Sequence, residues 1–286
     1  MFVIVGAVVV TLSVLGGFLL AGGNLLVLLQ WAEFVTIGGA AIGSLIISAP
    51  LPVLKKIVAA IPALIKAESY TKQDYMELLK SFNDLFLVAQ RDGLLAIERH
   101  VEKPEESEIL SQNKKFIESE LAKTFFCDTM KVMLSGGIPP HELEELIDAE
   151  IETFENEQKP VSSLISKVGD SLPGLGIVAA VLGIIVTMSS IDKGAAYVGM
   201  HVAAALVGTF LGVLLSYGYV NPIATNLELV NETKARYLHT IKACIVAYSK
   251  GNPPIIAVEF ARRTIFSDIR PSFSELENFV RGKKEQ

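Results

Sequence analysis

Four stretches of this sequence contain no Asp, Glu, Lys or Arg, and they decide what the chain can fold into. The stretches are residues 1–32, 34–54, 171–191 and 194–227. Each is long enough for the roughly 20 residues that a helix needs to cross a bilayer. Because 51% of all residues are hydrophobic, an ordinary soluble domain is a poor fit. The sequence therefore predicts an all-α integral membrane protein with four transmembrane helices. We place these helices near residues 2–21, 34–53, 173–191 and 197–220.

Basic residues beside these stretches predict the orientation of the chain. They follow the second stretch, precede the third and follow the fourth: Lys55, Lys56, Lys66, Lys159, Lys167, Lys234 and Arg236. Lys and Arg near the ends of membrane helices favour the cytoplasmic side. We therefore expect both termini and the long insertion to be cytoplasmic. The predicted domains are residues 1–54 (helices 1 and 2), 55–170 (cytoplasmic helical domain), 171–224 (helices 3 and 4) and 225–286 (cytoplasmic tail).

The insertion is acidic and shows helical periodicity. It contains 22 acidic and 14 basic residues, a formal charge of −8, which argues against nucleic acid as a partner. Apolar residues at helical spacing predict helices over 74–100, 107–135 and 141–157, the last of which starts at Pro139 and Pro140. The polar face of the third helix carries carboxylates and no base. It is either a solvated face or an acidic docking surface.

Motifs of enzymes and metal sites are missing from the sequence. It contains no P-loop, no GxSxG, no HExxH and no Cys/His cluster with the spacing of metal ligands. We therefore expect no catalytic residue, no metal ligand and no enzyme activity. Cys127 and Cys244 lie in polar segments placed in the cytoplasm, so they are predicted to be reduced structural thiols. His201, which lies inside the fourth stretch, is predicted to be a hydrogen-bonded residue near a helix end.

Carboxylates are absent from the predicted membrane helices, because Glu33 falls in the short turn between the first two. Proton and cation relays within membranes use Asp, Glu or His side chains. If this chain conducts ions, another subunit must therefore bring the carboxylate.

Small residues recur along one face of the third and of the fourth predicted helix. The two sets are Pro173, Gly176, Ala180, Gly183 and Thr187, and Ala204, Gly208, Gly212 and Ser216, with Thr209 beside the second set. Small side chains let helices approach closely in lipid. They serve either tight packing or a groove for a helix of another chain with a file of water. Pro173 and Pro222 bracket the two helices and suit a hinge or a hydrated entrance.

Three segments of the sequence resemble those of a known family. Residues 168–186 read VGDSLPGLGIVAAVLGIIV, residues 204–224 read AALVGTFLGVLLSYGYVNPIA, and residues 253–273 read PPIIAVEFARRTIFSDIRPSF. Along essentially the whole chain, the sequence resembles the MotA family of flagellar stator subunits. The TolQ/ExbB energy-coupling proteins share only the last two membrane helices with it.

This resemblance implies a proton-driven stator in the cell inner membrane. Five such chains would surround a dimer of a MotB-like single-span subunit whose membrane aspartate carries the ion. The cytoplasmic insertion would push a charged helix of the rotor's switch complex. Pro173 and Pro222 match the two functional prolines of the family, and the small face of the third helix would line the helices of the partner. No cofactor is implied beyond the proton.

The resemblance also implies a rotor contact and a coupling ion. Residues 89–100 read AQRDGLLAIERH, where the family has basic residues just before the glycine and a glutamate five residues after it. Glu98 matches the glutamate, and Arg91 is the expected basic residue. On a continuous helix, seven residues place both on one face. Sodium-driven relatives have threonines at the positions of Ala180 and Thr209. Ala180 therefore favours protons, because Na⁺ requires several oxygen ligands.

Two other functions remain open from the sequence. One is a TolQ/ExbB-like energy transducer, against which the two additional N-terminal helices and the tail segment 253–273 argue. The other is a non-conducting membrane scaffold whose acidic insertion docks soluble proteins.

Overall fold

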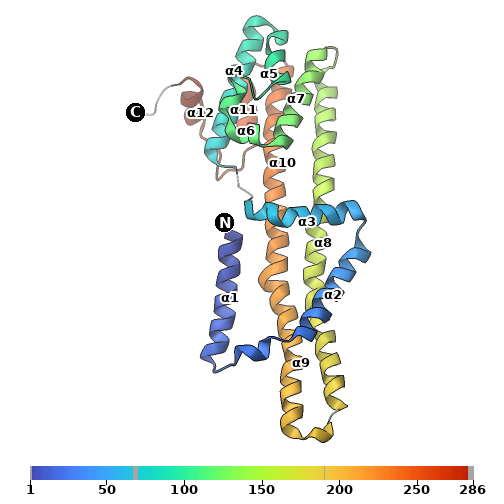
Figure 1. Ribbon diagram of the computed structural model, residues 1–286. Coiled ribbons are helices and arrows are strands. Elements are labelled where there is room, and N and C mark those ends of the chain that lie inside the picture. Colours follow the sequence, from blue (N-terminus) through green and yellow to red (C-terminus); the bar gives the residue numbers. More distant parts are fainter. Residues whose placement is uncertain (1, 67–69, 190, 283–286) are drawn as a thin grey trace. The chain divides into compact units, whose positions relative to one another are not determined.

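The computed structural model describes residues 2–66, 70–189 and 191–282, and every element in these ranges is a helix (Figure 1). The chain divides into two compact units. The first contains the described part of residues 1–67 and residues 157–230, and the second the described part of 68–156 and 231–286. The first unit is built from α1 (Phe2–Leu20), η1 (Leu25–Leu28), α2 (Trp31–Ser48), α3 (Leu51–Lys66), η4 (Ile191–Lys193), α9 (Ala195–Leu215), η5 (Ser216–Val220) and parts of α8 (Pro140–Met188) and α10 (Asn221–Ser249).

Among the described residues, four helical segments are long and apolar enough to cross a membrane, as the charge-free stretches predict. They are Phe2–Leu20, Leu25–Ser48 and the apolar parts of Pro140–Met188 and Ala195–Ser249. The third predicted membrane helix does not begin at residue 173. It continues the insertion helix that starts at Pro140, so α8 is one helix of 49 residues. The predicted domain boundaries at residues 54, 170 and 224 mark where the chain is expected to leave or enter the bilayer, and they stay a prediction.

The second membrane helix differs from the prediction of residues 34–53 at both ends. It ends at Ser48, and Ala49 is extended with φ −141° and ψ 141°, because a proline at position 50 disfavours helical backbone in the residue before it. It begins at Trp31, so Glu33 lies in its first turn and is buried. The prediction that the membrane helices lack carboxylates is therefore wrong.

Glycines of α8 and α9 face each other, and the two helices lie side by side (Figure 1). A Cβ added to Gly176 would lie 2.6 Å from the carbonyl oxygen of Gly208, and one added to Gly212 would lie 2.5 Å from that of Leu172. A Cβ added to Gly183 would lie 2.8 Å from the Cβ of Ala205. Of the two uses predicted for these small residues, the structure shows tight packing within the chain. The expectation that the small face of the third helix lines the partner's helices stays a prediction.

The second unit has an aromatic core. Its helices, besides the remaining parts of α8 and α10, are α4 (Lys72–Asp92), η2 (Leu94–Ile97), α5 (Glu98–Glu102), η3 (Leu110–Gln112), α6 (Lys114–Glu118), α7 (Glu120–Ser135), α11 (Pro254–Arg262) and α12 (Phe273–Val280). Phe82 stacks on Phe126 with the ring centres 4.5 Å apart, and Phe86 stacks on Tyr248 at 4.1 Å. Such contacts add to the hydrophobic stabilisation from burying the rings.

Two predicted helices of the insertion are interrupted in the structure. The segment 74–100 breaks at Gly93, and the segment 107–135 is divided into η3, α6 and α7. Ser119 ends α6 and caps α7, accepting a hydrogen bond from the backbone N–H of Ala122. Cys127 and Cys244 are free buried thiols, as predicted, and burial raises the pKa of Cys127 to about 11. A thiol with so high a pKa is protonated and unreactive at neutral pH.

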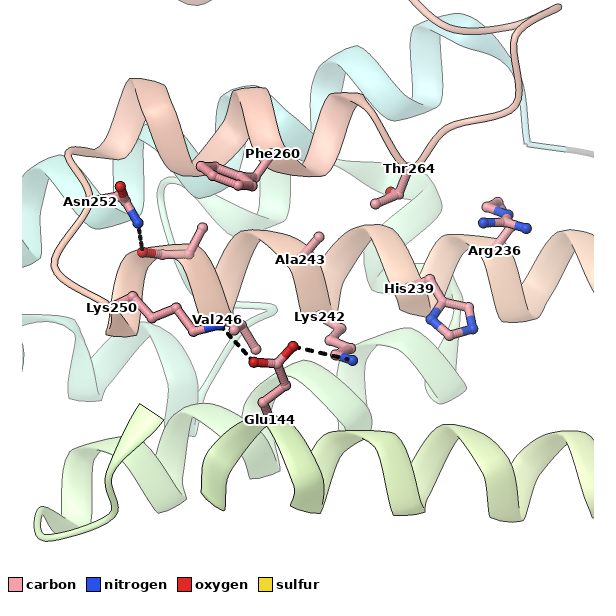
Figure 2. A pocket seen from close by; sticks show the side chains of 11 residues that line it. Glu144, Arg236, His239, Lys242, Ala243, Val246, Lys250, Asn252, Phe260 and Thr264 are labelled. Carbon is pink, nitrogen blue, oxygen red and sulfur yellow. Dashed lines mark hydrogen bonds and ion pairs between the residues drawn. The ribbon is translucent and has the colours of Figure 1, made fainter. Parts of the chain in front are cut away.

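Part of the acidic face of α8 pairs with α10 within the second unit. Lys242 lies 2.6 Å from Asp148. Glu144 lies 2.7 Å from Lys250 and 3.9 Å from Lys242 (Figure 2). Glu144, Lys242 and Lys250 line a pocket of about 360 Å³ together with Arg236 and His239. Because the α8 carboxylates neutralise its lysines, we assign the pocket no ligand. This part of the acidic face is neither fully solvated nor free for a docking partner.

Candidate functional site

The two candidate prolines lie beside a contact between α8 and the start of α10. The Asn221 side chain donates a hydrogen bond of 2.9 Å to the Asp170 carboxylate. Asn221 also packs against Gly169 so closely that a Cβ there would collide with its amide. Asp170 precedes Pro173 by three residues, and Asn221 directly precedes Pro222. The structure therefore ties the two proline-containing segments together.

A π-helical turn precedes Pro222 and follows from the chemistry of proline. Pro222 has no N–H, and its ring crowds the carbonyl four residues earlier. The chain adapts through η5, where the N–H of Asn221 donates to the carbonyl of Ser216, five residues back. Isolated π turns inside α-helices are frequent at functional sites. Pro222 is exposed and lines an open groove against α1, with Gly6, Val10 and Tyr219 among its neighbours.

Ala180 and Thr209 lie along the contact between α8 and α9. Ala180 is 7% exposed and shares the helical face of Gly176 and Gly183, which pack on α9. The Cα of Thr209 would lie 3.2 Å from a Cβ on Gly176. Of the four candidate residues of the ion pathway, the structure thus brings Ala180 and Thr209 to one helix pair. Pro173 lies on the same helix as Ala180, two turns earlier. Pro222 faces a different groove.

Glu33 is a candidate that the sequence reasoning missed. It is 8% exposed, and its carboxylate lies against Gly183 and Gly208 in the same helix pair. The signal was present in the sequence. Pro50 ends the helix near residue 48, and the length needed to cross a bilayer then moves its start to a position before Glu33.

His201 has the role predicted for it. Its Nδ1 atom lies 3.0 Å from the carbonyl oxygen of Tyr197, one turn earlier, and its ring stacks on that of Tyr197. Among the described residues, no group of three or more His, Cys, Asp or Glu has the arrangement of a metal site.

The candidate rotor residues, Arg91 and Glu98, do not share one helix. Arg91 lies near the end of α4, and Glu98 is the first residue of α5. Gly93 separates them with φ 91°, so the expectation of a common face on a continuous helix is wrong. Both residues are exposed. Arg91 donates to Asp92 through two of its nitrogens, and this pairing raises the pKa of Arg91 and lowers the pKa of Asp92.

Apolar side chains are exposed beside the two charged residues. Leu87 is 47% and Leu95 70% exposed, and Leu87 lines a shallow hollow with Gln90 and Arg91. Exposed apolar groups rimmed by charges are typical of protein-interaction sites. We call Leu87, Arg91, Leu95 and Glu98 the α4–α5 surface.

Replacing Gly93 by Ala is expected to destabilise the protein by about 1–3 kcal/mol. The backbone at Gly93, with φ 91° and ψ 157°, lies in a region that is essentially restricted to glycine, and other residues there cost that much. The measurement is the thermal midpoint of the purified protein in detergent. Gln90→Ala, an exposed change three residues earlier, serves as the control and should have little effect. Equal midpoints for the two variants would contradict the prediction.

Comparisons with known proteins identify the family. Residues 4–93 match the family "Motility protein A N-terminal", and residues 113–239 match the "MotA/TolQ/ExbB proton channel family". Motility protein A of Salmonella typhimurium is 40% identical over 99% of this chain and 96% of its own length. The chain belongs to the motility protein A family. Motility protein A of Escherichia coli is also 40% identical, over 99% of this chain and 96% of its own length.

A solved structure agrees with this fold. The MotAB structure from C. jejuni matches with a TM-score of 0.80, covering 94% of this chain and 98% of that chain at 21% identity. The predicted resemblance and the all-α fold with four membrane helices are thus confirmed. As a member of the motility protein A family, the chain is a multi-pass membrane protein and a flagellar stator subunit of the proton-channel type, and not an enzyme. The TolQ/ExbB-like and scaffold alternatives are set aside.

Proposed function

We propose that this stator subunit conducts protons only together with a single-span, MotB-like subunit, and that the flow turns the flagellar rotor. The observation that supports this most is the distribution of carboxylates. Residues 34–54, 171–191 and 194–227 contain none. Among the described residues, Glu33 at the start of α2 is the one carboxylate within the apolar parts of the four membrane helices. Protons crossing a membrane need titratable groups along the way. The aspartate of the partner supplies the missing group.

The finer arrangement is also proposed. Five chains surround a dimer of the partner in the inner membrane, with both termini in the cytoplasm, as the basic residues beside the membrane helices favour. The route for protons runs past Pro173, Ala180, Thr209 and Pro222. Ala180 leaves the route with one hydroxyl fewer than a sodium site would use, which favours protons.

This chain alone is expected to leave vesicles tight to protons, whereas the activated complex with its partner should conduct. The measurement is the rate of internal acidification of vesicles under an imposed pH gradient. A complex in which the partner's membrane aspartate is replaced by asparagine serves as the control and should stay tight. Acidification by this chain alone at the rate of the complex would overturn the proposal.

The α4–α5 surface is proposed to contact the rotor. Arg91 and Glu98 offer both signs of charge there, and charge patterns steer association more than they add affinity. Exposed charge pairs contribute only about 0–1 kcal/mol, so folding does not depend on them.

Glu98→Lys should therefore reduce swimming without reducing assembly. A compensating charge reversal on the rotor helix should restore part of the loss. The measurement is spreading on swim plates, with the amount of membrane-inserted complex determined separately. Glu152→Lys, an exposed reversal on α8, is the matched control and should swim normally. If reversal of both Arg91 and Glu98 leaves swimming at the parental level, the rotor contact lies elsewhere.

A further inference from the structure

The carboxylate of Glu33 has no role in the route described above, yet its position is unusual. Glu33 is 8% exposed, and its Oε2 atom is inaccessible and has no hydrogen-bond partner among the described residues. Most buried polar side-chain atoms in proteins are hydrogen-bonded. An ionised carboxylate without a partner is very costly in an apolar interior, and such a group takes up a proton instead.

Two glycines provide the space that this carboxyl group fills. A Cβ on Gly208 would collide with Oε2 and lie 3.1 Å from Cδ of Glu33. A Cβ on Gly183 would lie 3.6 Å from Oε1. Even the smallest side chain at position 208 would therefore occupy the place of the carboxyl group.

The same glycines place Glu33 beside the proposed route. Gly208 directly precedes Thr209, and Gly183 lies one helical turn after Ala180 on the face of α8 that packs on α9. The start of α2 lies against α9 in the first unit (Figure 1). The carboxyl group thus lies against the same two helices, α8 and α9, that carry Ala180 and Thr209.

Charged side chains do not face Glu33 from the elements around it. The described residues of η1, α2, α9 and the membrane part of α8 contain no other Asp, Glu, Lys or Arg. His201 on α9 is a titratable residue two turns before Gly208. Its Nδ1 atom lies 3.0 Å from the carbonyl oxygen of Tyr197. The hydroxyl of Thr187, one turn beyond Gly183, donates to the carbonyl of Gly183 at 2.7 Å. The surroundings therefore offer Glu33 no counter-ion.

We propose that Glu33 is a proton-binding site on the ion route of this chain. Its carboxyl group binds a proton in the space between α2, α8 and α9 and exchanges it with water. The route then has a protonatable group on this chain as well as the aspartate of the partner. The inference rests on the proposed proton-conducting function, to which it adds a second site.

Infrared spectroscopy of the complex in lipid vesicles tests the proposal. At neutral pH the parent should show the C=O stretch of a protonated carboxyl that the Glu33→Gln variant lacks. The band should shift when H₂O is replaced by D₂O, because the proton exchanges with water. Glu33→Gln should also lower the proton flux of the activated complex.

A pair of glycine substitutions on α9 provides a matched control. Gly208→Ala puts a carbon atom where the carboxyl group lies and should shift or remove the band, whereas Gly199→Ala meets open space and should leave it unchanged. This pair also decides the matter if Glu33→Gln fails to assemble.

Three results would overturn the proposal: ionised carboxylate bands for Glu33 at neutral pH, a carboxyl band that does not respond to D₂O, or an unchanged flux in Glu33→Gln. If the parent complex shows the exchanging band but no complex conducts protons, the proposed function is wrong, whereas proton binding by Glu33 still holds.

Discussion

Replacing Pro173 by Leu is expected to leave the chain in the membrane and to abolish swimming. Pro173 lies inside α8, where it offers no N–H to the carbonyl of Gly169 and its ring crowds that carbonyl. Leu would supply the missing hydrogen bond and remove the crowding, so the path of α8 would change. Gly169 packs directly on Asn221. The change would therefore displace the junction of α8 and α10 beside Pro173 and Pro222, past which the ion route is proposed to run.

The measurement is the swimming speed of cells with the amount of inserted complex determined in parallel. Pro160 provides a matched control, since it too lies inside α8 but in its polar part and is exposed. Pro160→Leu should swim. If Pro173→Leu cells swim normally at normal protein levels, Pro173 has no role in the mechanism.

The number of membrane helices was predictable because lipid leaves the backbone few choices. Backbone groups cannot stay unpaired in the bilayer, so an apolar stretch of sufficient length becomes a helix. Helix ends were less predictable. A charge-free stretch excludes a carboxylate by definition, so Glu33 was expected in a turn although α2 includes it.

The break at Gly93 shows a second limit. Glycine within a helical pattern is often tolerated at a cost of about 1 kcal/mol, and periodicity alone does not reveal a positive φ. Here the turn at Gly93 leads into η2, whose Ile97 is completely buried in the core of the second unit. Packing between distant segments therefore decided the conformation, and the shared face of Arg91 and Glu98 disappeared with it.

The candidate site was only partly accessible from the sequence. Pro173 and Pro222 can be recognised in the sequence as candidate residues, and their roles come from the resemblance to the family. The same pattern of small residues, such as Gly176, can serve helix packing within one chain or between two chains. Only the three-dimensional structure shows that Gly176 meets Gly208, and that Gly208 also makes room for Glu33.

Gly176→Ala and Gly174→Ala, two identical changes two residues apart on α8, are expected to have opposite effects on stability. A Cβ at Gly176 would lie 2.6 Å from the carbonyl oxygen of Gly208, whereas a Cβ at Gly174 has nothing within 4 Å. Because the obstacle is backbone, Gly176→Ala must separate α8 from α9, and overpacking of this kind costs about 1–3 kcal/mol. At Gly174 only the helix preference of alanine acts, which is worth up to about 1 kcal/mol.

The thermal midpoint of the purified chain in detergent should therefore fall for Gly176→Ala and rise for Gly174→Ala. Gly212→Ala should behave like Gly176→Ala, since its Cβ would lie 2.5 Å from the carbonyl oxygen of Leu172. A common effect of all three substitutions would mean that glycine acts through helix preference and not through close contact. Opposite effects would show that α8 and α9 pack on each other through these glycines, which leaves their remaining faces to the partner subunit.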